Sequence, residues 1–351
     1  MGFSNRLYIF LFSLLFSSIL AQDHGFFNQV WLEEGLSQSS ISSIVQDKKR
    51  LMWFGTQDGL NRYDGRLIEQ FNFKPFDSKS ISGDDITGFC IQDNQLYIIS
   101  SGGLDVMDLN NQNVIHYKET VKEKEKPAIL SRIWNINNKI YLNTNKGFTQ
   151  LTAKNNSFAI DPIQFQEREK NELKTFVFAL CESGNNSVYA ATNKGIFVME
   201  PGKKIFVPLF NINSIVKTEA NTAVDCQTIL FRNNKLYFSV GPSYFVFDIP
   251  SAQIKSINLP SFGPSLINHS FIDNLGNIWL GTNGAGLYRL SGIQSDSIYL
   301  EKSFNKNSNE QFGLKSNDIS SIYQNTQSNS DIVWIGTRDA GVFNYSYSKN
   351  S

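Results

Sequence analysis

Few residues in this chain have the types and spacing that catalysis or metal binding requires. The 351 residues include three histidines and three cysteines, namely His24, His116, His269, Cys90, Cys181 and Cys226. The chain has no Cys-x-x-Cys or Cys/His ligand spacing and no Gly-x-Ser-x-Gly, His-Glu-x-x-His or phosphate-loop pattern. Cys90 and Cys181 fall in apolar segments, where a cysteine acts as a small hydrophobic residue. The sequence therefore predicts no catalytic set, no metal site and no cofactor.

The remaining candidates are polar side chains in glycine-bearing turns and near the starts of strands. Amides and charges close to aromatic residues suit hydrogen bonding and stacking with a polyhydroxylated ligand. The candidate ligand contacts are Gln57, Asp58, Arg132, Asn145, Lys146, Asn193, Lys194, His269, Asn283, Arg338 and Asp339. Polar residues are also common in turns for conformational reasons, so a structural role is the alternative for each of them.

A short pattern that recurs seven times must position these turns. An aliphatic–aromatic pair is followed by Gly or Thr and then by a glycine-bearing turn, most clearly in Met52–Thr56, Ile278–Thr282 and Val333–Thr337. The copies are centred on Trp53, Tyr97, Tyr141, Tyr189, Tyr237, Trp279 and Trp334, at intervals of roughly 45 residues. Such a period with strand-like units is typical of a β-propeller with one blade per repeat. The sequence thus predicts an all-β, seven-bladed β-propeller over residues 22–351, with the central aromatic residues packed between blades.

Within one unit, the pattern predicts four antiparallel strands. In the first unit these are Ile41–Asp47, Leu51–Thr56, Leu60–Tyr63 and Leu67–Phe73. The last unit ends after its third strand, whereas the segment Phe26–Trp31 belongs to no unit. A propeller must pair its first and last blades or leave open strand edges. We therefore expect the N-terminal segment to supply the fourth strand of the last blade and to close the ring.

Charge and the N-terminus indicate an exported chain. The formal net charge is zero and 18% of residues are charged, which gives no electrostatic reason to expect nucleic acid or an anionic membrane as partner. Residues 1–21 combine Arg6, the short apolar run Leu7–Leu20 and Ala21, as in a signal peptide, with an uncleaved anchor as the alternative. No second apolar run of spanning length follows. We expect a periplasmic or secreted mature chain without a membrane span.

Several of these runs resemble a known family. Glu34–Ser37, Ile41–Asp47 and Trp53–Gly65 look like the two-component regulator propeller repeat, as do Trp279–Tyr288 and the run Asp318–Ile322 with Trp334–Thr337. The resemblance implies the periplasmic sensor of Bacteroidetes-type hybrid two-component systems, which commonly detects oligosaccharides. Typical members also carry a second propeller, an immunoglobulin-like domain, a membrane helix and a histidine kinase. This sequence shows one propeller only, so the alternatives are a fragment, a truncated gene product and a free-standing propeller.

Three functional hypotheses remain open. The first is a noncatalytic sensor propeller that binds an oligosaccharide or a partner protein, such as a second propeller or a partner sensor subunit. The second is an enzyme on the same fold, a lyase or glycoside-active protein, which requires an acid–base pair at the channel mouth. Asp58 and Asp339 are the carboxylates of the candidate turns, and ring closure makes their units neighbours. The third is a protein-interaction scaffold without a small ligand, because the fold alone does not separate these functions.

Overall fold

The computed structural model describes residues 25–119, 126–154, 157–166, 174–210, 215, 225–263, 265–295, 297–306, 313–325 and 330–347. The expected signal peptide, residues 1–21, and His24 lie outside the described residues. The helices of the described residues are two short 3-10 turns, η1 (Leu32–Glu34) and η3 (Ile293–Ser295). All other regular structure in the described ranges is β-strand.

The strands follow one another in antiparallel hairpins. The first half of the chain contains β1 (Phe26–Val30), β2 (Ile41–Gln46), β3 (Met52–Thr56), β4 (Gly59–Tyr63), β5 (Ile68–Phe71), β6 (Ile86–Gln92), β7 (Gln95–Ser100), β8 (Gly103–Asp108), β9 (Val114–Glu119), β10 (Leu130–Ile136), β11 (Lys139–Thr144), β12 (Gly147–Lys154), β13 (Ser157–Pro162) and β14 (Gln164–Phe165). The second half contains β15 (Val177–Glu182), β16 (Val188–Thr192), β17 (Gly195–Met199), β18 (Ile205–Phe210), β19 (Ile229–Arg232), β20 (Lys235–Val240), β21 (Ser243–Asp248), β22 (Gln253–Ile257), β23 (Ile267–Ile272), β24 (Ile278–Thr282), β25 (Leu287–Ser291), β26 (Tyr299–Phe304), β27 (Ile319–Tyr323), β28 (Ile332–Thr337) and β29 (Val342–Ser346). The strands of the first unit, β2 to β5, match the four segments expected from the sequence.

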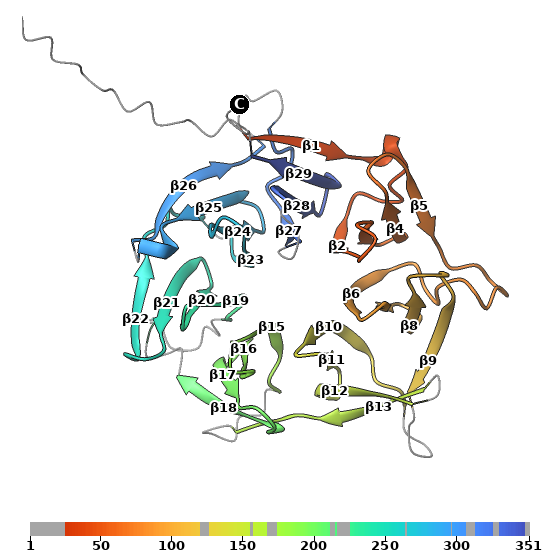
Figure 1. Cartoon of the computed structure of the whole chain (residues 1–351), viewed down its shortest axis with the longest axis horizontal. Coiled ribbons are helices and arrows are strands. Elements are labelled where there is room, and N and C mark those ends of the chain that lie inside the picture. Colours follow the sequence, from red (N-terminus) through yellow and green to blue (C-terminus); the bar gives the residue numbers. More distant parts are fainter. Residues whose placement is uncertain are drawn as a thin grey trace, which may run out of the picture.

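Hydrogen bonds join these strands into six sheets arranged around a central axis (Figure 1). Four sheets have four strands, and a fifth gains the short β14 beside β18. The eight-stranded sheet consists of two antiparallel halves, β6–β9 and β10–β13, joined by a parallel pairing of Ser157 and Phe158 with Lys118 and Glu119. The protein is therefore an all-β, propeller-like fold, with β2, β6, β10, β15, β19, β23 and β27 nearest the axis (Figure 1).

The N-terminal strand lies at the outer edge of the last sheet. β1 pairs antiparallel with β29, with Phe27 opposite Tyr345 and Val30 opposite Val342. The Phe27 ring is buried and makes an edge contact with Phe304 at 5.1 Å between ring centres. This pairing is the one expected for the segment that belonged to no repeat.

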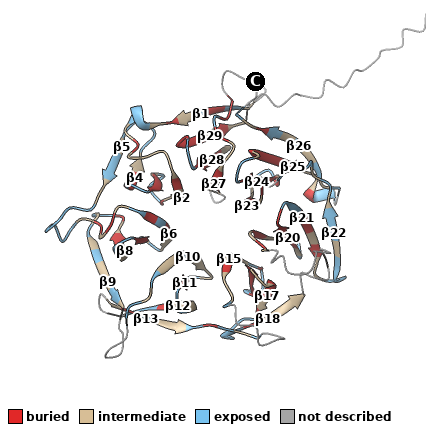
Figure 2. Ribbon diagram, turned by 180° about the vertical axis from the view of Figure 1, so that it is seen from behind, coloured by how far each residue is buried: buried red, intermediate tan, exposed pale blue. Residues whose placement is uncertain are grey.

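Apolar burial is concentrated on the strands in the middle of each sheet (Figure 2). Every residue of β3, β16 and β24 is buried, whereas the outer strands β5 and β22 contain only half-buried and exposed residues. A core cluster containing Ile41 and Phe54 of the first unit also contains Val342 of the last unit. The side chains between adjacent sheets therefore form the core, including the one between the last and first units.

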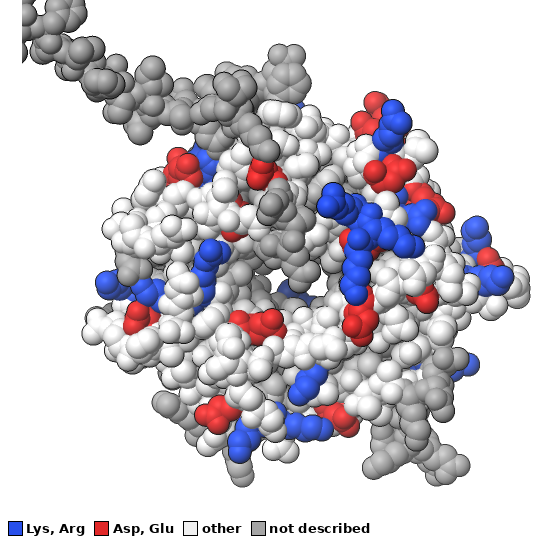
Figure 3. All heavy atoms as spheres, in the orientation of Figure 1, with Lys and Arg blue, Asp and Glu red and all other residues white. Residues whose placement is uncertain are grey.

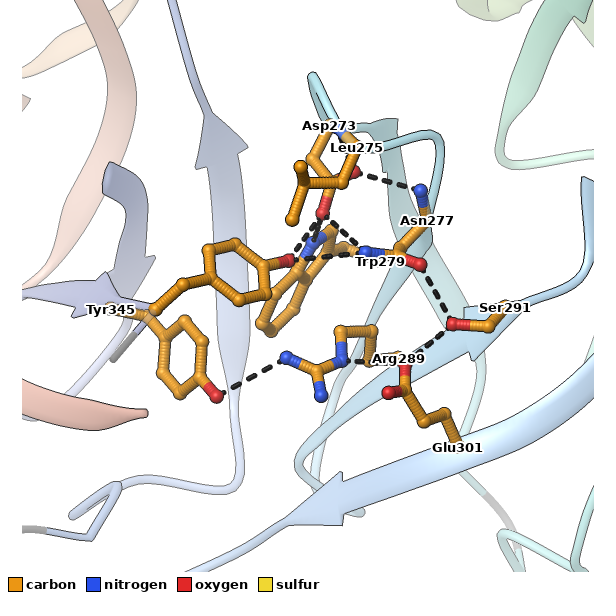
Figure 4. Close-up of polar contacts among 9 residues, drawn as sticks. Asp273, Leu275, Asn277, Trp279, Arg289, Ser291, Glu301 and Tyr345 are labelled. Carbon is orange, nitrogen blue, oxygen red and sulfur yellow. Dashed lines mark hydrogen bonds and ion pairs between the residues drawn. The ribbon is translucent and has the colours of Figure 1, made fainter. Parts of the chain in front are cut away.

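The repeated aromatic residues pack in this core, as their repetition suggested. Trp279 is fully buried, and its Nε1 donates to the carboxylate of Asp273 at 2.8 Å (Figure 4). Trp53 donates in the same way to Asp47 at 3.0 Å, so the carboxylate six residues earlier satisfies the buried indole N–H in both units. Trp334 differs, because it is half-buried against Phe54 of the first unit.

Tight turns account for the recurring Asn and Gly residues. Asn137 and Asn138 have φ angles of 51° and 56°, the left-handed conformation that a two-residue hairpin requires and that Asn tolerates. Gly59, with φ of 98°, has no room for a side chain, because an added Cβ would lie 2.8 Å from the carbonyl oxygen of Phe71. The expected turn chemistry is confirmed at these positions.

His116 and the three cysteines have structural roles. His116 lies on β9, an outer strand as expected, and its Nδ1 is 2.7 Å from the buried Asp105 carboxylate. All three cysteines are free. Cys226 is buried, whereas Cys90 and Cys181 are partly exposed as whole residues, which is more than the sequence predicted. Their thiol groups are nevertheless buried, and burial raises the pKa of all three thiols.

Candidate functional site

The turns between second and third strands share an internal hydrogen-bond pattern. In the β3–β4 turn the Thr56 hydroxyl donates to the Gly59 carbonyl at 2.9 Å and accepts from the Asp58 backbone N–H at 3.0 Å. The same pattern starts at Thr144, Thr192, Thr282 and Thr337. A buried threonine therefore fixes each of these turns, and the sequence signal that predicts it is Thr followed three or four residues later by Gly.

Three predicted asparagine contacts are engaged by the protein backbone. The side-chain oxygen of each accepts a hydrogen bond from the connection that leads into the first strand of the same unit. The donors are the backbone N–H groups of Ile129 to Asn145 (2.9 Å), Phe176 to Asn193 (2.8 Å) and Leu266 to Asn283 (2.5 Å). These asparagines therefore link the turn between the second and third strands to the connection that enters the first strand of the same unit.

The other turn candidates divide into paired and exposed side chains. The Lys146 ammonium lies 3.1 Å from the nearly buried Glu119 carboxylate at the end of β9. Gln57 and Asp58 are exposed at the tip of the β3–β4 turn. The Lys194 backbone N–H belongs to the threonine-fixed turn between β16 and β17.

Arg132 lies on the innermost strand β10 and is held against aromatic rings. Its Nη1 donates to the Phe178 carbonyl at 2.8 Å, and its guanidinium carbon lies 5.8 Å and 5.6 Å from the ring centres of Phe176 and Phe178. Arg132 is exposed as a whole residue, while partial desolvation of its guanidinium and, secondly, the Arg338 charge lower its pKa. Arg132 remains a cation at neutral pH because an arginine pKa starts far above it.

His269 lies on the innermost strand β23, across the ring from β10 (Figure 1). Its Nδ1 is buried and has no hydrogen-bond partner. Burial, and secondarily the charge of Arg132, lower the pKa of His269 to about 4, so the imidazole is neutral at pH 7. The structure therefore brings Arg132 within electrostatic reach of both His269 and Arg338, although the three residues come from different sheets.

Arg338 and Asp339 belong to a charged group that includes a residue missed by the sequence analysis. The Arg338 Nε lies 3.5 Å from the Asp318 carboxylate, and Asp339 accepts a hydrogen bond from the Ser316 hydroxyl. Burial raises the pKa of Asp318, Arg338 opposes this shift and Asp339 adds to it. The Asp318 carboxylate, which the sequence analysis did not single out, therefore lies within electrostatic reach of Asp339.

A β-bulge occurs near the start of six innermost strands. The register shifts by one residue between Ile41 and Ser43 of β2, and at the matching positions of β6, β10, β15, β23 and β27. A bulge bends a strand and changes the direction of its side chains. Arg132 and His269 directly follow two of these bulges. The bulges therefore set the directions in which these two side chains point.

The space-filling view shows an opening at the centre of the molecule (Figure 3). Among the described residues, no group of His, Cys, Asp and Glu has the geometry to hold a metal ion. No helix in the described ranges is long and apolar enough to cross a membrane.

Comparison with known proteins shows what parts of the chain resemble. The model of the two-component regulator propeller matches residues 35–58, which lie at the start of the first unit. The chain carries a two-component regulator propeller repeat. Over 75 residues the chain is also 45% identical to histidine kinase P4 of Formosa agariphila, a stretch of 21% of this chain and 6% of that kinase.

Solved structures similar to this fold include extracellular domains of bacterial two-component systems. One is described as the extracellular domain of a hybrid two-component system from B. thetaiotaomicron, with a TM-score of 0.71 and 18% identity over 93% of this chain. A second domain of this description has a TM-score of 0.69 and 17% identity over 92% of this chain. The propeller described here spans 40% and 42% of the lengths of those two chains. Streptogramin B lyase has a TM-score of 0.63 with 12% identity, over 92% of this chain and 98% of its own.

Proposed function

We propose that this chain is a noncatalytic, ligand-binding propeller in the sensory part of a two-component system. The observation that carries this proposal is the regulator-propeller repeat at residues 35–58, in a fold similar to extracellular domains described as parts of hybrid two-component systems. The ligand would be an oligosaccharide or the surface of a partner protein. It would bind at the channel mouth, which we define as the ends of the first strands and the turns between second and third strands.

The proposal includes a closed ring of seven blades. The two halves of the eight-stranded sheet would be separate blades bridged by the short β9–β13 pairing. The last blade would contain β1, so that both ends of the chain contribute to one blade. Closure of this kind removes the exposed strand edges that an open ring would present.

Export and partners form the next part of the proposal. Residues 1–21 would direct the chain to the periplasm or outside the cell, because the similar domains are described as extracellular. Those chains are longer than this propeller, so a second propeller or another sensor subunit is the partner we propose. Signalling would then pass through that partner to a histidine kinase.

An enzymatic function is the second candidate. It is favoured by the Asp318 and Asp339 carboxylates at the channel mouth and by the similarity in fold to streptogramin B lyase. A carboxylate whose pKa is raised by burial is a candidate general acid or base.

A binding screen tests the proposed function. The protein would be heated in the presence of neutral and acidic oligosaccharides, and each stabilising compound would then be assayed for chemical change. A raised Tm with intact ligand supports the sensor, since binding to the folded state alone stabilises it. Cleavage that Asp318→Asn abolishes would support the enzyme, and no shift across the panel would favour a protein-interaction scaffold.

A further inference from the structure

The connection between β5 and β6 presents a fully exposed aromatic side chain. This loop projects outward from the ring (Figure 1). Phe76 is 109% exposed, more than any other large hydrophobic residue of the described part of the chain, so none of the described residues covers its ring. Every residue from Phe73 to Lys79 is exposed. Single exposed apolar residues are common on protein surfaces, so the meaning of this one depends on how the loop holds it.

Phe76 occupies a backbone position that aromatic residues rarely take. The Asp77 backbone N–H donates to the Lys74 carbonyl at 3.1 Å, with Pro75 and Phe76 between them. Phe76 has a φ angle of 68°. Proline at the second position and a positive φ at the third are the features of a type II turn, whose third position favours Gly or Asn. A bulky residue is strained there, and no packing of its ring within the fold offsets the strain.

Hydrogen bonds fix this turn on the ring of sheets. The Lys74 backbone N–H donates to the Ser80 hydroxyl at 3.0 Å, and that hydroxyl donates to the Asp77 carbonyl at 2.9 Å. The Phe73 backbone N–H donates to the carboxylate of Asp84, close to the start of β6, at 2.6 Å. The loop is therefore ordered before it meets any partner, which reduces the conformational entropy that binding costs.

The connection between β22 and β23 shows the alternative, an aromatic ring that the fold itself uses. Phe262 is 6% exposed, and its ring centre lies 4.6 Å from that of Tyr288. The Phe76 ring lies in solvent instead, although its loop is equally a connection between adjacent units. Its apolar surface is therefore available to another molecule.

Two lysines flank the exposed ring. Lys74 and Lys79 are exposed, and no ion pair joins either ammonium group to a carboxylate of the described residues. Asp77, the carboxylate between them, accepts from the Lys79 backbone N–H at 3.0 Å. A projecting apolar group with two cations beside it is complementary to a concave apolar pocket with carboxylates at its rim.

We propose that Phe76 inserts into an apolar pocket with an acidic rim on a partner protein. This inference rests on the partner included in the proposed function and specifies the surface through which it binds, whatever the channel mouth recognises. An aromatic anchor that fills a pocket supplies a large share of the binding energy of an interface. The flanking lysines raise the rate of association with an acidic surface and make it dependent on salt.

Thermal denaturation of the full chain tests whether the ring is free. Phe76→Asn should raise the Tm by up to about 3 °C, because Asn adopts a positive φ more readily and no packing is lost. Phe262→Asn, at the buried position of the other connection, should lower the Tm by about 5 °C or more. A Tm of Phe76→Asn that falls as it does for Phe262→Asn would show that the fold uses the ring, and would overturn the proposal.

Site-specific cross-linking tests the partner. The full chain carries p-benzoylphenylalanine at position 76 or, as the control, at Leu67, which is 72% exposed directly before β5, in the cells that produce it. A protein cross-linked only from position 76 is then purified, and its Kd for the original chain is measured. Phe76→Asn should weaken this binding by at least about thirtyfold, and Leu67→Gln should leave it unchanged. Lys74→Gln combined with Lys79→Gln should slow association about tenfold at low salt.

Three results would overturn the proposed anchor. They are identical or absent cross-links from the two positions, a second copy of this chain as the cross-linked protein, and unchanged binding by Phe76→Asn. In each case a Tm raised by an intact saccharide would still support the sensor, so failure of the anchor is distinguishable from failure of the proposed function.

Discussion

The buried Arg289 offers the most direct test of how adjacent sheets are joined. Its side chain is 1% exposed on β25, and its Nε lies 3.0 Å from the Glu301 carboxylate (Figure 4). Its Nη1 donates to the Tyr345 hydroxyl of the next sheet at 3.2 Å. The guanidinium carbon also lies 5.5 Å, 5.7 Å and 5.2 Å from the ring centres of Trp279, Tyr345 and Tyr347.

Replacing Arg289 with Met should lower the free energy of unfolding by about 3 kcal/mol. Breaking a buried ion pair by removing one partner costs about 3–5 kcal/mol, and each desolvated cation–π contact contributes up to about 2 kcal/mol. We take the lower end because Met keeps most of the apolar volume and Glu301, 35% exposed, can be hydrated after the change. The stabilising contacts to Tyr345 and Tyr347 are inter-sheet contacts, so their loss should loosen the last sheet.

Arg62 of the first unit provides the matched control. It pairs with Glu69 and lies 5.9 Å from the rings of Trp53 and Phe71, but it is 25% exposed. Arg62→Met should therefore cost less than about 1 kcal/mol, as is usual for solvent-accessible pairs. Urea denaturation of both variants measures the difference. Equal effects would show that burial adds nothing to the Arg289 contacts, and a more stable Arg289→Met protein would show that desolvation of the guanidinium outweighs them. Either result would refute the reasoning.

Three further predictions concern stability. The pKa of His269 is about 4 in the folded protein and about 6.5 in the unfolded chain. Between these two pH values the unfolded state binds one more proton than the folded state. Acidification from about pH 6.5 to about pH 4 should therefore lower the free energy of unfolding by at most about 3 kcal/mol. Urea denaturation at both ends of the interval measures this loss, and His269→Gln should remove it; an unchanged pH dependence would contradict the assignment. Thr192→Val should lower the free energy of unfolding by about 1–2 kcal/mol, because it removes both hydrogen bonds of the Thr192 hydroxyl, whereas Thr192→Ser keeps them. Equal denaturation midpoints for the two variants would argue against this role. Phe27→Ala should lower the free energy of unfolding by about 3–4 kcal/mol and speed hydrogen exchange in β1. Phe26→Ala, at a position that is 44% exposed, should change it by less than about 0.5 kcal/mol. Similar losses of stability in the two variants would mean that β1 is not held by its buried face.

Much of the architecture was predictable because it depends on local, repeated features. Alternating strand residues, Asn and Gly turns and the aromatic residue of each unit act over a few positions, so they remain visible in the sequence. The expected first-unit strands match the structure, and Trp53 and Trp279 are buried as expected. The N-terminal strand was predictable by elimination, since the last unit lacked a strand and one segment lacked a unit.

The candidate site was predictable only as a set of loops. Turn residues such as Asn193 and Lys146 are polar in any propeller, and the structure shows these two bonded to backbone and to Glu119. The charge interaction of Asp318 with Asp339 and the bulge before His269 depend on how strands pair, which no local pattern encodes.

The repeated strand unit, its turns and the recurring central aromatic residue could be deduced from the amino-acid sequence, because short-range periodicity encodes all three. Which polar groups find hydrogen-bond partners, and which charges from distant repeats act on one another, depends on the folded arrangement of the sheets. Arg132 and His269 are far apart along the chain and lie in different sheets. The arrangement of the sheets around one axis places β10 and β23, inner strands of distant repeats, on opposite sides of the same centre (Figure 1).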